Sequence, residues 1–408
     1  MASQIFTNIS LLAGVHAPSG FIRGNSLKQL PVIERAYLVI EGDTIAGFGS
    51  MRDYNGAMND VPAGTIILPA WCDSHTHLVY AGSRETEFID KINGLSYAEI
   101  AAKGGGILNS ADKLNKTPED ELYRQASDRL QKVARAGSGA VEIKSGYGLT
   151  LEGEIKMLRV IKRLQQNSPV KIKSTFLAAH AFPVEFRDDH EAYIRLIINE
   201  MLPIVAHEKL ADFIDVFCED GFFSPEEMSR ICEAGKKAGL TPKLHVNQLN
   251  SIGGVEAGIE AGALSLDHLE IVTEEDIRLL GSFAGAATLL PTAALFLRMA
   301  MPPARQLINA GGAVTLASDY NPGSSPSGNM NLVIALSCIL MKMLPEEAIN
   351  AATFNGACAM QIENEYGSIA AGKKANLIFT KTVPSLAYLP YSFGENLVDR
   401  VMLNGNFI

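Results

Sequence analysis

The feature that most constrains the fold of this chain is a regular alternation of short apolar runs with helix-length segments through its centre. This alternation is typical of parallel strands joined by helices. Two of the intervening segments, Glu152–Gln166 and Pro225–Ala238, have the apolar spacing of amphipathic helices. The strand candidates are a run that ends in Asp73–His77, then Ala140–Lys144, Ile172–Ala179, Phe213–Cys218, Lys243–Val246, Ala263–Asp267, Ala286–Leu290 and Ala313–Ala317.

The number of strand candidates favours one parallel-sheet fold over another. Eight strands within about 300 residues match a (β/α)8 barrel, whose typical size is about 250 residues plus insertions. The alternative is an open doubly wound sheet, but no GxGxxG motif follows the first strand. We therefore expect an α/β fold with a (β/α)8 TIM-type barrel over residues 66–365.

Both ends of the chain have the pattern of β-structure. Tyr37–Glu41 and Thr44–Gly49 are strand-like runs on either side of Gly42-Asp43, which is a strong hairpin signal. Two more strand-like runs follow residue 374. Neither end is long enough to bury a core alone. We therefore expect residues 1–65 and 366–408 to pair into one smaller β-sandwich domain built from both chain termini.

Charge and cysteine content exclude several classes of protein. Thirty-five basic against 45 acidic residues give a net charge of −10, whereas a nucleic-acid partner would favour a basic stripe. No apolar run approaches the roughly 18 residues of a membrane helix, and no basic residue precedes the apolar N-terminal stretch as a secretory signal requires. The five scattered cysteines contain no CxxC pair. We expect a cytoplasmic enzyme without a nucleic-acid or membrane partner, for which a homodimer is the commonest assembly.

The histidines are concentrated at strand ends. Five of the eight fall at or just past the C-terminal end of a strand candidate, and an aspartate follows the eighth strand in the same way. In a barrel these ends converge on the face that carries the active site. The sequence thus predicts a polar site there, built from His75, His77, His180, His245, His268 and Asp319.

The sharpest local signal is the HTH motif at 75–77. Residues i and i+2 of a strand point to the same side, so both imidazoles can bind one cation, and neutral imidazole suits Zn, Fe and similar metals. Taken alone, the motif fits two packed histidines in the barrel mouth equally well. His245 and Asp319 at other strand ends favour the metal, because three histidines and one carboxylate leave room for water, as catalytic sites require.

Three further segments lie close to the predicted site. The KSGYG sequence at 144–148 follows the second strand and places a lysine, a serine and a tyrosine near the mouth, where Tyr147 is either a residue at the edge of the core or a substrate contact. The NPGSSP turn at 321–326 follows Asp319, although turns of this composition usually have no other role. Arg84, on the loop that leaves the first strand, could bind a carboxylate through two nitrogens.

These motifs together resemble a known superfamily. Leu68-Pro69 followed by DSHTH at 73–77, histidines after strands five and six, and an aspartate after strand eight are similar to the metal-dependent amidohydrolase superfamily, in which both termini also form a small β-domain. More narrowly, the chain resembles the imidazolonepropionase family from about residue 68 to 330, in the segments HTHLVYAGSRETEF, EIKSGYGL, TFLAAHAFP, DVFCEDG, HVNQLNSIGG, GALSLDHLE and ASDYNPGSSPSGNM.

The resemblance implies an activity and a set of site residues. It implies hydrolysis of the cyclic amide C–N bond of 4-imidazolone-5-propanoate, a small anion, to N-formimidoyl-L-glutamate in histidine degradation, with one Zn2+ or Fe2+/Fe3+ ion per subunit. The implied metal ligands are His75, His77, His245 and Asp319; the catalytic residues are Asp319, His268 and Gln248; the substrate contacts are Arg84, Tyr147, His180, Gln248, Asn321, Gly323 and Ser324.

The implied roles follow from side-chain chemistry. Asp319 would accept a proton from water and return it to the leaving ring nitrogen. His268 would orient the nucleophile or stabilise the developing oxyanion. Arg84 would hold the propionate and so determine which carbonyl is attacked.

Other members of the superfamily are the alternatives: another cyclic-amide hydrolase, a nucleobase deaminase, or a non-catalytic scaffold. Superfamily deaminases keep a glutamate as proton shuttle where this chain has Gln248, and a neutral base offers no carboxylate to Arg84. A two-metal site is disfavoured, because the fourth strand ends in Cys218-Glu219 and has no lysine there to be carboxylated. The scaffold is disfavoured because every expected ligand is present.

Overall fold

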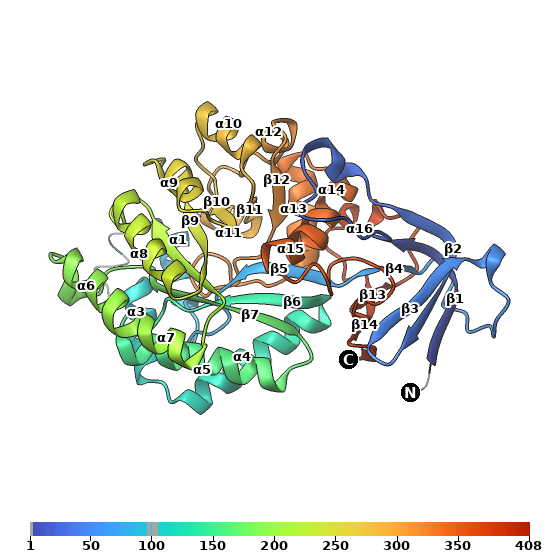
Figure 1. The fold of residues 1–408 in the computed structure, drawn as a ribbon, viewed down its shortest axis with the longest axis horizontal. Coiled ribbons are helices and arrows are strands. Elements are labelled where there is room, and N and C mark those ends of the chain that lie inside the picture. Colours follow the sequence, from blue (N-terminus) through green and yellow to red (C-terminus); the bar gives the residue numbers. More distant parts are fainter. Residues whose placement is uncertain (1–2, 96–98, 100–104) are drawn as a thin grey trace.

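A computed structural model describes residues 3–95, 99 and 105–408, and shows a barrel with a second sheet beside it (Figure 1). The barrel sheet has eight strands, which neighbour one another in chain order from β5 to β12 and pair in parallel. Helices cover its outer side. None of the helices within the described residues is long and apolar enough to cross a membrane.

The eight expected barrel strands are confirmed, with ends that differ by a few residues. Most are buried along their whole length, as strands between a barrel interior and a helix layer must be. They are β5 (Trp71–Thr76), β6 (Ser138–Lys144), β7 (Lys171–Ala179), β8 (Phe213–Cys218), β9 (Thr241–Val246), β10 (Ser265–His268), β11 (Ala286–Leu289) and β12 (Ala313–Leu316).

The barrel closes where its last strand returns to its first. Thr76 forms a parallel bridge with Tyr320, whose carbonyl oxygen also accepts a hydrogen bond of 2.9 Å from the His77 amide. Beside it, the Asp73 carboxylate accepts hydrogen bonds from the amide and hydroxyl of Ser318, at 2.9 and 2.6 Å. These contacts bring the loop after β12 against the end of β5, the two places where metal ligands are expected.

The helices begin where the sequence supplies capping side chains. Ser224 and Glu227 form a reciprocal capping box at the start of α8, and Thr150 caps α5, so both predicted amphipathic helices are confirmed. The helices are α1 (Glu85–Ile92), α3 (Ile107–Lys116), α4 (Glu119–Arg135), α5 (Leu151–Asn167), α6 (His190–Leu196), α7 (Leu202–Glu208), α8 (Pro225–Lys237), α9 (Gly254–Glu260), α10 (Glu274–Ser282), α11 (Pro291–Leu297), α12 (Ala304–Asn309), α13 (Met330–Met341), α14 (Pro345–Ala352), α15 (Phe354–Ala359) and α16 (Tyr388–Tyr391).

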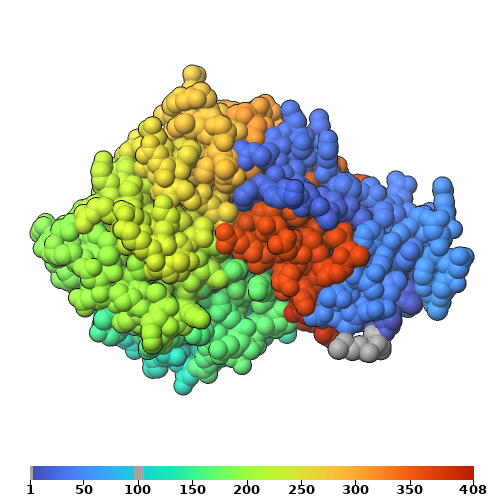
Figure 2. All heavy atoms as spheres, viewed as in Figure 1, coloured from blue at the N-terminus to red at the C-terminus, as the bar shows by residue number. Residues whose placement is uncertain are grey.

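The two termini share one sheet, as expected, and its hairpin turns at Gly42-Asp43. The sheet has seven strands, in the order β15-β14-β13-β4-β1-β2-β3, and packs a core of its own around Ile9, Leu38 and Phe379. Figure 2 shows the N-terminal segments and the segments near residue 360 meeting on one face. The strands are β1 (Ser3–Ala13), β2 (Val32–Glu41), β3 (Thr44–Ser50), β4 (Ile66–Pro69), β13 (Leu377–Thr380), β14 (Val398–Leu403) and β15 (Asn406–Phe407).

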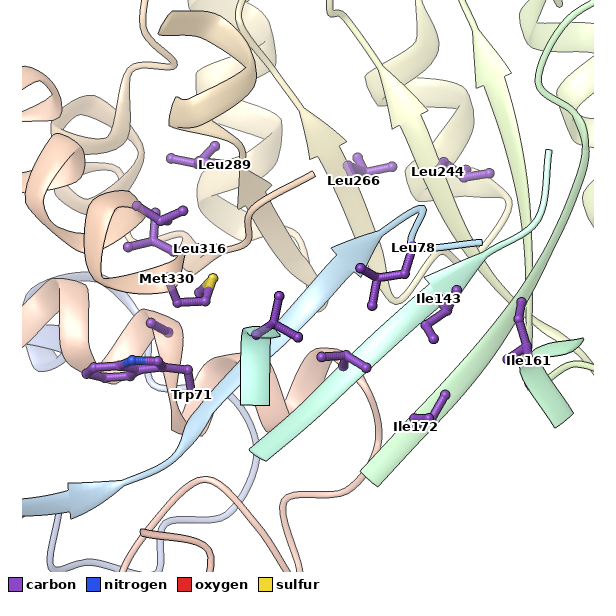
Figure 3. Packing of buried hydrophobic residues seen from close by; sticks show 14 of the residues in the cluster. Trp71, Leu78, Ile143, Ile161, Ile172, Leu244, Leu266, Leu289, Leu316 and Met330 are labelled. Atoms are coloured by element: carbon purple, nitrogen blue, oxygen red, sulfur yellow. The ribbon is translucent and has the colours of Figure 1, made fainter. Parts of the chain in front are cut away.

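Side chains of the barrel strands alternate between two buried faces. Leu244, Leu266, Leu289 and Leu316 come from four successive strands and belong to the large apolar cluster between the strands and the helices (Figure 3). Because neighbouring residues of a strand point to opposite faces, the residues beside them face the barrel interior. Many of these inward residues are polar, and they form the floor of the site described next.

Candidate active site

Three histidines and one aspartate meet at the carboxyl end of the barrel. His75 lies on β5, His77 directly follows it, and His245 lies on β9; their ligand nitrogens are within 4.8 Å of one another. Asp319 lies three residues after β12, and its Oδ1 is 3.6 Å from Nε2 of His75 and 3.5 Å from Nε2 of His77. All four side chains are buried. The sequence expected these four residues to meet, and the structure brings them together.

This cluster has the chemistry of a metal site. Among the described residues, His75 Nε2 and Asp319 Oδ1 are buried without a hydrogen-bond partner, an arrangement that is costly unless something binds them. Burial lowers the pKa of His75, His77 and His245 well below the usual value, and neighbouring basic groups lower it further. Neutral imidazoles are the form that binds transition metals, so the residues present fit a metal ion.

Two carboxylates aim two of these imidazoles. His75 donates from Nδ1 to Asp267 Oδ2 at 2.7 Å, and His245 donates from Nδ1 to Asp215 Oδ2 at 2.8 Å. A carboxylate at Nδ1 leaves Nε2 as the lone-pair nitrogen and holds the ring in one orientation. Both Nε2 atoms are therefore presented to the centre of the cluster.

Lys144 does not lie at the mouth of the barrel, where the KSGYG motif suggested it. It is the last residue of β6, its side chain is fully buried, and its ammonium lies among the carboxylates of Glu142, Asp215 and Asp267. Burial alone would lower the pKa of Lys144, but these carboxylates outweigh that effect and raise it. Lys144 therefore stays charged and pairs with carboxylates inside the barrel.

Asp319, one of the expected ligands, and His268 both line the cavity beside the three histidines. Burial raises the pKa of Asp319 to about 6, against the lowering effect of His268. For His268, burial would lower the pKa, but Glu270 and Asp319 outweigh it and raise the value. Both residues have left-handed backbones, with φ of 51° and 87°. Non-glycine residues in this region cost about 1–3 kcal/mol each and persist where surrounding contacts hold them, which is common at functional sites.

A cavity of about 440 Å3 opens above this cluster, within the range of small-ligand sites. Its apolar walls come from Phe217, Phe222 and Leu297. Every site residue expected from the sequence except His75 lines this cavity: His77, Arg84, Tyr147, His180, His245, Gln248, His268, Asp319, Asn321, Gly323 and Ser324.

Arg84, which directly precedes α1, is held at one end of the cavity by Glu87 of that helix. Its Nε and Nη2 donate to Glu87 Oε2 at 2.9 and 2.6 Å, which leaves Nη1 directed towards Gly323. A Cβ at Gly323 would overlap the guanidinium, so the absence of a side chain there makes room for Arg84. Lys91 lines the same end and donates to the Gly323 carbonyl at 3.2 Å. Two cations thus face one end of the cavity.

Hydrogen bonds hold several of the other residues expected to contact the substrate. Asn321 Oδ1 accepts from the amides of Gly323 and Ser324, both at 2.8 Å, and the Ser324 hydroxyl donates to Asp319 Oδ2 at 3.2 Å. His180 donates from Nδ1 to the Gly146 carbonyl at 3.0 Å and stacks on His77 with ring centroids 5.2 Å apart. Asn321 therefore shapes the loop that carries Ser324, besides lining the cavity.

Several buried acids support the site and were missed from the sequence. Glu154 accepts from the amides of Gly148 and Leu149, and so shapes the Tyr147 loop; Glu219 accepts from the amide of Leu249, next to Gln248. The other missed acids accept hydrogen bonds from site residues: Asp215 from His245, Asp267 from His75, and Glu87 from Arg84. The available signal was a charged residue inside an apolar strand run or first helical turn, because buried charges need partners.

Known proteins resemble this chain along most of its length. Residues 66–408 match the model of the Amidohydrolase family. The chain is 55% identical over 390 residues to the imidazolonepropionase of Flavobacterium johnsoniae, covering 95% of each chain, and 53% identical over 408 residues to that of Christiangramia forsetii, covering 99% of each.

Solved structures share the fold at low identity. The guanine deaminase of E. coli superposes with a TM-score of 0.74 at 12% identity, over 100% of this chain and 99% of that one. A zinc complex of atrazine chlorohydrolase from Arthrobacter aurescens gives 0.71 at 14% identity, over 99% and 94%. These two matches establish the barrel architecture. The family model and the near-full-length relatives show that the chain belongs to the imidazolonepropionase family, within the larger amidohydrolase family.

Proposed function

We propose that this protein hydrolyses the ring amide of 4-imidazolone-5-propanoate and yields N-formimidoyl-L-glutamate, as a step of histidine degradation. The observation that carries the proposal is that one cavity is lined by three of the four candidate metal ligands, His77, His245 and Asp319, and also by the cations Arg84 and Lys91. A metal-activated hydrolysis needs the first group, and an anionic tail on the substrate is matched by the second. Relatives that bear the imidazolonepropionase name match 95% and 99% of this chain at 55% and 53% identity.

The substrate would lie with its carboxylate at Arg84 and its ring towards the histidines. Nη1 of Arg84 is the nitrogen that Glu87 leaves for a ligand, and Lys91 adds a second positive charge. Tyr147, His180 and Gln248 would surround the ring, and Asn321, Gly323 and Ser324 would contact the substrate or the product.

We propose His75, His77, His245 and Asp319 as the metal ligands. When bound, a divalent transition metal supplies Lewis acidity that makes water nucleophilic near neutral pH. Three histidines and a carboxylate accept either Zn2+ or Fe2+/Fe3+, and we propose one ion per subunit.

Asp319 would carry out both proton transfers of the reaction. The oxygen of water adds to the ring carbonyl carbon while Asp319 takes one of its protons; the carbon–nitrogen bond then breaks, and Asp319 returns the proton to the leaving nitrogen. Its pKa of about 6 leaves it mostly ionised, and therefore able to accept a proton, at neutral pH. His268, whose raised pKa favours a donor form, would stabilise the developing oxyanion, with Gln248 assisting in orientation.

We also propose that the enzyme is located in the cytoplasm. The five cysteines are all free, which fits a reducing compartment such as the cytoplasm. The homodimer expected from the sequence stays a prediction.

The test is an absorbance assay of imidazolonepropionate consumption, combined with metal analysis of the purified protein. We expect one transition metal per subunit, and we expect His75→Ala to lose both the metal and the activity. Guanine serves as the control substrate, from which no ammonia should be released. Full activity of a metal-free sample would contradict the mechanism, and deamination of guanine without turnover of imidazolonepropionate would contradict the substrate.

A further inference from the structure

The interior of the barrel below the site contains a cluster of five charged side chains. It consists of Glu142, Lys144, Asp215, Lys243 and Asp267, all fully buried. They come from β6, β8, β9 and β10, so they can meet only across the inside of the barrel. Buried ion clusters are expensive, because desolvation offsets the attraction between the charges. A cluster kept at this depth therefore calls for a role besides stability.

Lys144 occupies the centre of this cluster. Its Nζ is 2.7 Å from Glu142 Oε1, 2.8 Å from Asp215 Oδ2 and 3.6 Å from Asp267 Oδ2. The ammonium donates a hydrogen bond to Asp215 Oδ2 and forms ion pairs with the Glu142 and Asp267 carboxylates. Among the residues that the structure describes, it is the only lysine or arginine paired with Asp215 or Asp267.

The two aspartate oxygens that face Lys144 are the ones that hold the imidazoles. Asp215 Oδ2 also accepts from His245 Nδ1, and Asp267 Oδ2 also accepts from His75 Nδ1. One ammonium thus contacts both carboxylates that aim two of the proposed metal ligands. We propose that Lys144 is a positioning residue of the metal centre, which holds Asp215 and Asp267 in place and thereby directs His245 and His75 at one point.

Lys243 provides a natural control. It is as deeply buried and pairs with the other oxygen of the same glutamate, Glu142 Oε2, at 2.6 Å. Its hydrogen bonds go to the carbonyls of Ala359 and Ser74, at 2.8 and 3.2 Å. The two lysines therefore share a carboxylate and a depth, and they differ in whether they touch the aspartates behind the histidines.

The experiment compares two double variants of the full-length chain loaded with Co2+. Lys144→Met with Glu142→Gln, and Lys243→Met with Glu142→Gln, each remove one ammonium and the same carboxylate, so the net charge of the interior is unchanged in both. Co2+ affinity is measured by competition with a chelator, and ligand geometry by the visible absorption of the bound Co2+. We expect the Lys144 pair to bind Co2+ about 10–100-fold more weakly than wild type with an altered spectrum, and the Lys243 pair to keep both.

Equal weakening in the two double variants would overturn the role of Lys144, because loss of buried charge would then explain it. Should the Lys144 pair fail to fold by circular dichroism, Lys144→Gln and Lys243→Gln in the same Glu142→Gln background repeat the comparison with a donor retained. The inference rests on the proposed metal centre. Binding of Co2+ by the wild type tests that centre separately from the role of Lys144. A wild type that does not bind Co2+ overturns the centre itself, whereas binding without a difference between variants overturns only the role of Lys144.

Discussion

The two faces of the barrel wall have opposite chemistry, although the same strands build both. On β10, Leu266 packs outward against the helix layer while Asp267 faces inward to His75. On β12, Leu316 faces outward while Thr315 faces inward and hydrogen bonds to Thr288 at 3.0 Å. Figure 3 shows the outward leucines of four neighbouring strands in one apolar layer.

The outer layer of the wall stabilises the fold, and the inner layer positions the residues of the candidate site. Barrel interiors of this fold are usually filled with Val, Ile and Leu, but here charged and hydroxyl side chains fill much of the inner layer. Since buried ion pairs contribute little net stability, the free energy of folding has to come mainly from the outer layer and from the core of the terminal sheet. Substitutions on the outer face should therefore mainly lower the free energy of unfolding, and those on the inner face should mainly weaken metal binding or catalysis.

The largest expected effect on folding is on the outer face. Leu266→Ala removes a fully buried side chain that packs beside Gly258 of α9, and should lower the free energy of unfolding by about 2–5 kcal/mol. Co2+ affinity of the folded variant should be unchanged. Urea unfolding and chelator competition measure the two quantities.

Substitution of the neighbouring residue, Asp267, should affect metal binding more than stability. Asp267→Asn should weaken metal binding about 10–100-fold, because the carboxylate behind His75 is lost, with a smaller loss of stability than Leu266→Ala. If both variants lost stability and metal affinity in the same proportion, the division between the faces would be wrong.

A substitution at the inner rim should reduce catalysis while leaving the fold intact. Asp319→Asn is nearly isosteric but cannot accept a proton, so kcat should fall about 10²-fold, which corresponds to about 2.7 kcal/mol. Steady-state kinetics on samples with verified metal content measure this. A near-normal kcat with metal bound would show that another group transfers the proton.

Substitution of the cations that line the cavity should change KM. Arg84→Met removes a charge-assisted contact that exists in both the ground and the transition state, so KM should rise about tenfold with kcat little changed. Lys91→Met, at the same end of the cavity, is the matched variant and should give a smaller rise, because its ammonium is also engaged by the Gly323 carbonyl. Unchanged kinetic constants for Arg84→Met would place the carboxylate elsewhere.

The smallest effect is expected away from the barrel interior, at His16. Burial, with a contribution from Lys373, lowers the pKa of His16 to about 4, and its ring lies 5.4 Å from that of Phe354 at the start of α15. The unfolded chain therefore binds more protons than the folded one between pH 6.5 and 4, so the contribution of this group is lost as the pH falls through that window.

His16→Phe keeps a ring beside Phe354 but cannot titrate. The free energy of unfolding of this variant should fall less between pH 7 and pH 5 than that of the wild type, while catalysis stays the same. Urea unfolding at the two pH values measures the difference. A wild type and variant with parallel pH dependence would show that His16 titrates normally in the folded protein.

Much of the architecture follows from local patterns. Alternation of apolar runs and amphipathic segments predicted the eight strands, since side-chain period is a local property of strands and helices. The HTH motif predicted two imidazoles on one side of β5, because residues i and i+2 always share a face. The positions of His245, His268 and Asp319 at strand ends were enough to gather them, because parallel strands of a barrel end on one face.

The sequence by itself thus determined which segments form the barrel strands and which strand ends carry the candidate ligands. Tertiary structure alone decided the partners: His75 meets Asp267, 192 positions away, and Lys144 meets Asp215, 71 positions away. The room left by Gly323 for Arg84 likewise depends on how two distant loops are placed. The physical reason is that alternation along a strand sets the face of a side chain, whereas register between strands and closure of the barrel set which buried charges come within bonding distance.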